Sequence, residues 1–129
     1  GVQTCALPIY LRRFGGCVLS AGGAQSSSNS LSGAGQAYKF YTSSWSMTKN
    51  RYYSLMDGSG NVLFTVKAPL SLSSSLSLIS SPSMSSGSTY YIKYSTSAPT
   101  GATSSWDSVA YTGGTVSSAT NVFSFSATR

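Results

Sequence analysis

The chain has 129 residues, carries a net charge of +6, and contains no His, no Glu and only two acids, Asp57 and Asp107. This length fits one domain of about 100–150 residues and excludes a large multidomain enzyme. Proton transfer near neutral pH normally needs His or a carboxylate beside a partner, and a nucleophilic Ser needs such a base as well. We therefore expect no enzymatic activity.

The positive charge arises from a shortage of acids rather than from a cluster of bases. Phosphate binding normally needs Lys and Arg gathered in a stripe or patch. The eight basic residues are instead scattered along the chain, at Arg12, Arg13, Lys39, Lys49, Arg51, Lys67, Lys93 and Arg129. We expect no nucleic-acid partner.

Residues 1–9 resemble a translated sequencing-adapter oligonucleotide, a known contaminant of gene models built from short reads. A segment of this origin is not part of the natural protein, so Cys5 does not count as a cysteine of the fold, Cys17 alone remains, and no intrachain disulfide is expected. The natural protein is then expected to be longer, with any signal peptide lost. No run approaches the ~18 apolar residues of a membrane span.

The composition changes along the chain and predicts three segments after the adapter. Residues 10–24 hold a glycine-led apolar strand, and residues 25–37 are a linker because Ser, Gly and Asn dominate them and bulky apolar residues are almost absent. Residues 38–129 alternate short apolar runs with turn residues and form the main domain.

Six or seven strands are predicted in the main domain from an apolar periodicity close to two, depending on whether residues 108–111 are counted. They cover residues 38–45, 51–56, 61–67, 76–80, 89–94, 108–111 and 121–126. Asp57-Gly58-Ser59-Gly60 is a strong hairpin turn because Asp and Gly tolerate positive φ. The pattern predicts an all-β protein with a small antiparallel Ig-like β-sandwich.

Several short motifs resemble those of bacterial "carbohydrate-binding domain-containing" proteins, in which a parallel β-helix precedes a small all-β domain. The motifs run in order through the chain: Gly15-Gly16-Cys17-Val18-Leu19-Ser20-Ala21-Gly22-Gly23, then Asp57-Gly58-Ser59-Gly60-Asn61-Val62-Leu63-Phe64, then Ser80-Ser81-Pro82-Ser83-Met84, then Gly87-Ser88-Thr89-Tyr90, then Tyr111-Thr112-Gly113-Gly114-Thr115, and finally Val122-Phe123-Ser124-Phe125. Cys17 departs from the family, which commonly has Thr there. Trp106-Asp107 lies in a part that does not align with the family.

The resemblance implies a function for a longer parent protein. It implies that residues 10–24 are the last strand of an upstream β-helix, that this β-helix is a partner in cis, and that calcium belongs to that missing part only. It further implies a secreted or cell-surface protein that binds polysaccharide without cleaving it. The alternative is a structural spacer or protein-interaction sandwich with no sugar binding of its own.

Metal sites find little support in the residues themselves. Asp57-Gly58-Ser59-Gly60-Asn61 superficially matches the start of a calcium loop, but an EF-hand needs a bidentate Glu at its twelfth position, where Ala68 stands. Zinc sites need His and Cys ligands, and only Cys17 remains. We interpret the Asp57 segment as a hairpin turn and expect no cofactor in this chain.

Aromatic side chains are the remaining candidates for a site, because exposed rings stack on pyranose rings. Trp45, Trp106, Tyr41 and Tyr91 are predicted to bind carbohydrate, with Trp45 and Trp106 expected to be exposed because Ser-rich segments surround them. Tyr53, Tyr94 and Tyr111 are further members of a potential platform. The competing interpretation is that most of these rings fill the core of a sandwich poor in Leu.

Overall fold

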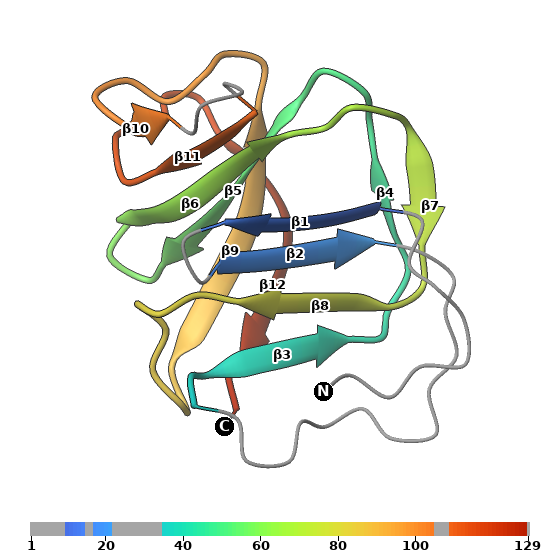
Figure 1. The fold of residues 1–129 in the computed structure, drawn as a ribbon, viewed down its shortest axis with the longest axis vertical. Coiled ribbons are helices and arrows are strands. Elements are labelled where there is room, and N and C mark those ends of the chain that lie inside the picture. Colours follow the sequence, from blue (N-terminus) through green and yellow to red (C-terminus); the bar gives the residue numbers. More distant parts are fainter. Residues whose placement is uncertain (1–9, 15–16, 22–34, 105–108, 129) are drawn as a thin grey trace. The chain divides into compact units, whose positions relative to one another are not determined.

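The computed structural model describes residues 10–14, 17–21, 35–104 and 109–128, with side chains described from residue 17 onward. All regular structure in these ranges is β-strand, and the strand pairings are antiparallel (Figure 1). The predicted class, an all-β protein of the small antiparallel sandwich kind, is confirmed. The Ig-like topology and the β-helix origin of residues 10–24 stay predictions.

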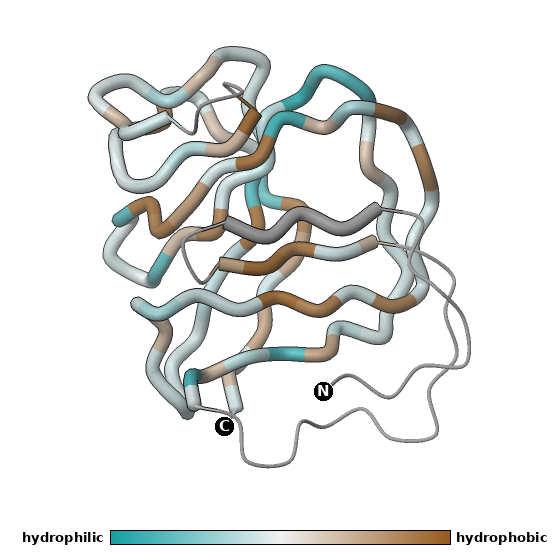
Figure 2. Tube along the Cα trace, viewed as in Figure 1, coloured by the Kyte–Doolittle hydropathy of each residue, from teal (hydrophilic) through white to brown (hydrophobic). Residues whose placement is uncertain are grey.

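The described residues of the first of two compact units are 10–14, 17–21, 35–46, 72–88 and 126–128. Its four-stranded sheet has the order β1-β2-β8-β3, formed by β1 (Tyr10–Phe14), β2 (Cys17–Ala21), β8 (Ser77–Ser80) and β3 (Tyr38–Tyr41). β4 (Trp45–Met47) pairs with β7 (Leu72–Ser74) in a separate two-stranded sheet. Apolar residues concentrate along β2 and β8 (Figure 2).

The described residues of the second unit are 47–71, 89–104 and 109–125, and they form a six-stranded sheet. Its strand order is β10-β11-β6-β5-β9-β12, formed by β10 (Thr103–Ser104), β11 (Ala110–Thr112), β6 (Val62–Lys67), β5 (Tyr52–Asp57), β9 (Thr89–Ser95) and β12 (Thr120–Ser126). Most of the predicted strands are present within a few residues. The strand predicted at residues 38–45 is an exception, because it divides into β3 and β4, which belong to different sheets. β1, β4, β7 and β10 were not predicted as separate strands.

The turn between β5 and β6 is the hairpin that the sequence predicts. Asp57 Oδ1 accepts hydrogen bonds from the backbone N–H groups of Ser59 and Asn61, each at 2.9 Å, and the Asn61 side-chain amide donates to Asp57 Oδ2 at 3.0 Å. Gly60 has φ +88°, which a residue with a Cβ adopts only with strain. These contacts fix the turn and, with it, the register of the two strands.

The strand Cys17–Ala21, which the resemblance assigns to an upstream β-helix, pairs within this chain. Val18 lies opposite Ser80 and Leu19 opposite Ile79, and Ser20 Oγ accepts the backbone N–H of Leu78 at 2.8 Å. Leu19 and Ala21 are fully buried. The strand therefore has hydrogen-bonded neighbours on both sides, β1 and β8. Most of its side chains are buried, as are those of β8. The linker predicted at residues 25–37 falls mostly outside the described residues.

Hydrogen exchange tests this anchoring of β2. We expect the backbone amides of β2 to exchange as slowly as those of β9, because both are interior strands of their sheets. Leu19→Ala removes a fully buried side chain and should lower the free energy of unfolding by about 2–5 kcal/mol. Rapid exchange throughout residues 17–21, with no loss of stability in Leu19→Ala, would show that β2 is not held by β8.

The Asp57 turn predicts a dependence of stability on acid pH. Hydrogen bonds from Asn61, Ser59 and Gly60 hold the pKa of the exposed Asp57 carboxyl below its ordinary value of 3.8. A lowered folded-state pKa stabilises the fold above pH 3.8, and that contribution is lost as pH falls through the folded pKa. In an NMR titration the Asp57 carboxyl should show a midpoint below 3.8, and Asp57→Asn, which keeps the acceptor oxygen, should weaken the acid dependence of unfolding. A midpoint at or above 3.8 would contradict the hydrogen-bonded turn.

Candidate functional site

Trp45 is buried, so the expectation that it is exposed is wrong. Only 7% of its surface is accessible, and its indole N–H donates to Ser77 Oγ at 2.9 Å. Ser77 Oγ also lies 3.1 Å from Ser74 Oγ, and Ser74 Oγ donates to the Leu76 carbonyl at 3.1 Å. The Ser-rich surroundings, taken as the mark of a loop, instead supply hydroxyl groups that satisfy a buried indole. Trp45 therefore presents no ring face to a ligand.

The other three residues predicted to bind carbohydrate lie in different parts of the chain. Tyr41 ends β3 in the four-stranded sheet and is half-buried. Tyr91 lies on β9 in the six-stranded sheet of the other unit and is also half-buried. Trp106 falls outside the described residues. Of the three that the structure describes, Tyr91 alone belongs to the group of side chains that we identify as the candidate site.

The candidate site is one face of the six-stranded sheet, here called the tyrosine–lysine face. The register places its members on the same side: Tyr52 lies opposite Lys67, Lys93 opposite Ser54, and Tyr111 opposite Thr65, which is itself opposite Ser54. Because side chains alternate along a strand, Tyr91 shares the side of Lys93. The five members are all half-buried: Tyr52, Lys67, Tyr91, Lys93 and Tyr111.

The rings and ammonium groups of this face form two groups. The ring centroids of Tyr52 and Tyr111 lie 6.2 Å apart with their planes tilted by 55°, and Lys67 Nζ lies 5.7 Å from the Tyr52 centroid. On β9, Lys93 Nζ lies 5.5 Å from the Tyr91 centroid. Each such cation–π contact contributes about 0.5–1 kcal/mol at an exposed site. The face thus offers aromatic surface flanked by strong hydrogen-bond donors.

The floor of the tyrosine–lysine face is a pair of buried hydroxyl groups. Ser54 Oγ and Thr65 Oγ1 lie 2.7 Å apart on neighbouring strands, and both residues have 0% exposure. Ser54 and Thr65 are small, and the larger Lys93 and Tyr111 lie opposite them on the neighbouring strands. A buried hydroxyl pair that satisfies itself costs little to bury and gives the face a rigid base.

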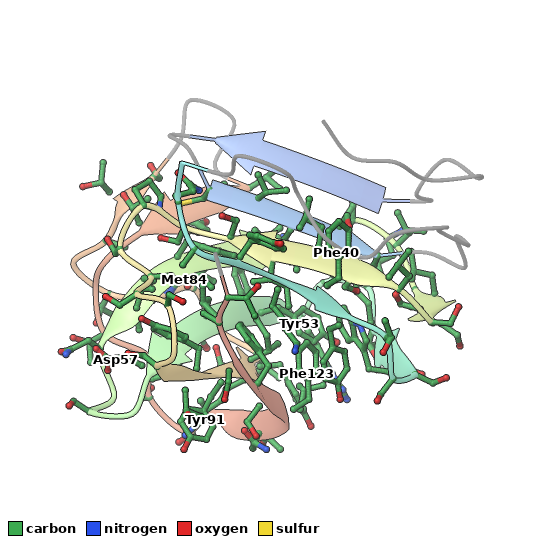
Figure 3. All side chains as sticks on the ribbon, turned by 90° about the horizontal axis from the view of Figure 1, so that it is seen from below. Phe40, Tyr53, Asp57, Met84, Tyr91 and Phe123 are labelled. Atoms are coloured by element: carbon green, nitrogen blue, oxygen red, sulfur yellow. The ribbon has the colours of Figure 1, made fainter. Side chains whose placement is uncertain are left out.

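The opposite side of the same sheet is apolar and buried. Tyr53, Leu55, Phe64, Val66 and Ile92 have between 0% and 1% exposure. Figure 3 shows Tyr53 and Tyr91 on different sides of this sheet. The alternation predicted for β9, with Tyr90, Ile92 and Tyr94 on one side and Tyr91 and Lys93 on the other, agrees with the register.

Tyr53 and Tyr94 belong to this second side and are not part of the candidate site. The Tyr53 hydroxyl accepts the backbone N–H of Thr48 at 2.8 Å, and its ring centroid lies 6.1 Å from that of Tyr94. The Arg51 guanidinium carbon lies 4.1 Å from the Tyr94 centroid and covers that ring. Both tyrosines are therefore engaged by contacts with their own sheet and with the segment that precedes β5.

The charge of the second unit is positive at the tyrosine–lysine face. Among the described residues of this unit the one acid is Asp57, at the tip of the β5–β6 hairpin. Asp57 and Tyr52 are the two ends of β5, about 17 Å apart along the strand, and the Asp57 carboxylate is engaged by the turn. Lys67 and Lys93 therefore face no described carboxylate on their side of the sheet.

Sequence reasoning missed Tyr52 as a site residue. Arg51-Tyr52-Tyr53 contains adjacent tyrosines that point to opposite sides, and the sequence alone does not say which one faces the core. The signal that identifies Tyr52 is its pairing with Lys67, which follows from the Asp57 turn and a register shift between Leu55 and Met56. The hairpin was predicted, but the register shift was not.

Comparisons with known proteins found no match to this chain. The chain matches no family model, no curated protein and no solved structure. In the part of the chain that the structure describes, no helix is long and apolar enough to cross a membrane. Within the same residues, no group of three or more His, Cys, Asp and Glu side chains is placed to hold a metal ion.

Burial raises the pKa of the Cys17 thiol, whose Sγ lies 3.9 Å from Ser81 Oγ.

Fluorescence tests the burial of Trp45. In a Trp106→Phe variant the remaining indole emission comes from Trp45, and we expect it to resist quenching by acrylamide because the ring is buried. Trp45→Phe keeps an aromatic ring but removes the N–H donor to Ser77, which should lower the free energy of unfolding by about 1 kcal/mol or more. Quenching as efficient as that of free tryptophan would restore Trp45 as an exposed site candidate.

Proposed function

We propose that this chain is a non-catalytic accessory module that binds polysaccharide through the tyrosine–lysine face of its six-stranded sheet. The observation that carries the proposal is the placement of Tyr52, Tyr111 and Lys67 on one partly exposed side of the sheet, with the ring and ammonium distances given above. Sugars are recognised by aromatic rings that contact their C–H groups and by polar groups that satisfy their hydroxyls. This face carries both.

The chemistry of the face supports binding rather than catalysis. Tyr hydroxyl and Lys ammonium groups donate hydrogen bonds, and the described residues of the face include neither a His nor a carboxylate that would accept a proton near neutral pH. The motif resemblance supports the same proposal: a longer secreted or cell-surface protein that binds polysaccharide, with a β-helix in cis. Calcium binding belongs to that β-helix in the proposal and not to this face.

A second candidate is a spacer or protein-interaction module that contacts no sugar. The burial of most of the aromatic rings that the structure describes favours it, since Trp45, Tyr53, Tyr90, Phe123 and Phe125 each have 7% exposure or less. These rings serve packing, as the core interpretation expects. The two candidates differ in one respect: the spacer has no use for the half-exposed rings of Tyr52 and Tyr111.

Affinity gel electrophoresis of the whole chain tests the proposal. Gels containing polygalacturonate, hydroxyethyl cellulose or soluble starch, each run with and without calcium, should retard the protein in at least one case. Tyr52→Ala and Tyr111→Ala should each weaken the retarding interaction about tenfold, because each removes roughly 1.4 kcal/mol or more of ring contact from the centre of the site.

Tyr41→Ala is the matched control. It removes another half-buried tyrosine, but from β3 in the four-stranded sheet, so retardation should be unchanged. Thermal unfolding of each variant separates lost binding from lost folding. Migration unaffected by all three polysaccharides would overturn the proposal and favour the spacer. If Tyr41→Ala abolished retardation and Tyr52→Ala did not change it, the binding site would be assigned to the unit that contains Tyr41.

A further inference from the structure

We infer that the tyrosine–lysine face binds a single extended glycan chain through two separate subsites, rather than a lone sugar or the flat surface of a polysaccharide crystal. This inference rests on the proposed function and specifies the form of its ligand. One subsite is the pair subsite of Tyr52, Tyr111 and Lys67; the other is the Tyr91 subsite of Tyr91 and Lys93.

The register sets the distance between the two subsites. Tyr52 lies opposite Ser95, and Tyr91 precedes Ser95 by four residues on the same strand and the same face. With about 3.4 Å per residue along the strand and about 4.8 Å between strands, the Cα atoms of Tyr52 and Tyr91 are about 14 Å apart. A monosaccharide or disaccharide is too short to contact both subsites, whereas a longer chain lying along β9 reaches them together.

The residues between the subsites also suit a chain. Lys93 lies opposite Ser54, between the levels of Tyr52 and Tyr91, and its Nζ lies 5.5 Å from the Tyr91 centroid, so its ammonium group donates to the part of such a ligand that adjoins the Tyr91 ring. The small Ser54 and Thr65 form the floor there and are fully buried. A ligand that joins the two subsites gains affinity by making the second contact intramolecular, by about 100-fold or more when the geometry fits.

The tilt of the rings excludes a flat ligand surface. The planes of Tyr52 and Tyr111 are inclined by 55°, so a planar array of sugar rings that lies on one tyrosine meets the other at an angle. The sheet itself twists from strand to strand, which carries Tyr111, Tyr52 and Tyr91 further out of a common plane. A separate, flexible glycan chain follows such a surface, and a crystal face does not.

The charge of the face adds a selection by ligand charge. Lys67 and Lys93 have no described carboxylate on their side of the sheet. Ligand oxygens, whether hydroxyl or carboxylate, therefore fit the face, and a cationic glycan such as chitosan is repelled.

Competition in the affinity gels tests the two-subsite ligand. The competitors are cellobiose and cellohexaose, maltose and maltohexaose, and the dimer and hexamer of galacturonic acid, each used against its parent polysaccharide. In the pair that competes, the hexamer should be at least about 100-fold stronger than the dimer. Tyr91→Ala should reduce the hexamer's potency as a competitor to nearly that of the dimer and leave the dimer's potency unchanged. Tyr52→Ala should lower the potency of both competitors. Microcrystalline cellulose and chitosan should not deplete the protein from solution.

Each contrary result has a separate meaning. The second subsite would be overturned if the dimer and the hexamer competed with equal potency. It would also be overturned if the hexamer's potency fell in Tyr52→Ala but not in Tyr91→Ala. Both results leave polysaccharide binding at the pair subsite intact. Depletion by microcrystalline cellulose that requires Tyr52 and Tyr111 would overturn the single-chain ligand. Absence of retardation in every gel would instead overturn the proposed function itself. Tyr41→Ala, folded and binding as the unsubstituted chain does, is the control for all arms.

Discussion

The register between β5 and β6 decides which side chains this protein buries and which it presents. Asp57 and Asn61 hold the turn that joins the two strands, and the shift between Leu55 and Met56 completes the alignment that puts Tyr52 opposite Lys67. A slip of one residue would move a strand's whole set of side chains to the other face of the sheet. The fully buried Phe64 and Val66 oppose such a slip, because the slip would expose their apolar surface to water at a free-energy cost of about 25 cal/mol per Å². The tyrosine–lysine face is thus a consequence of the core on the other side.

Serine is used in this protein as a buried partner as much as a surface residue. Ser and Thr are 43 of the 129 residues, and several of them lie in strands with almost no exposure. Each is satisfied in a specific way: Ser80 Oγ donates to the Ala37 carbonyl at 2.7 Å, Ser77 accepts the Trp45 indole N–H, and Ser54 pairs with Thr65. Buried hydroxyl groups cost about 1–3 kcal/mol when left unpaired, so these contacts constrain which strands lie together. They allow a chain poor in Leu to keep both a core and a defined arrangement of strands.

The sequence predicted the elements of the fold better than the surroundings of single residues. Periodicity and turn chemistry suffice for strands such as 62–67 and 89–95 and for the Asp57 hairpin, because these depend on neighbours in the chain. The pairing of β2 with β8 joins residues about 60 positions apart, and no local pattern encodes it. The same limit applies to the site. Trp45 has a local sequence typical of a loop, yet its indole is satisfied by Ser77 from another strand, whereas Tyr91 was placed on the right face because alternation along β9 is a local property.

The burial of Trp45 leaves tyrosines on strands as the aromatic residues of the proposed site. A tryptophan on a loop would bind sugar strongly but would have to be ordered on binding, at a cost in conformational entropy of the loop. Tyr52, Tyr91 and Tyr111 project from paired strands whose backbones are already fixed, and Ser54 and Thr65 beneath them are locked by their own hydrogen bond. In the proposed site each tyrosine offers less contact than an exposed tryptophan would, but several of them on one rigid sheet would act together without that ordering cost. Weak, preorganised contacts spread along a face suit a long and repetitive ligand better than a small one, because a polymer alone presents the same group to each of them.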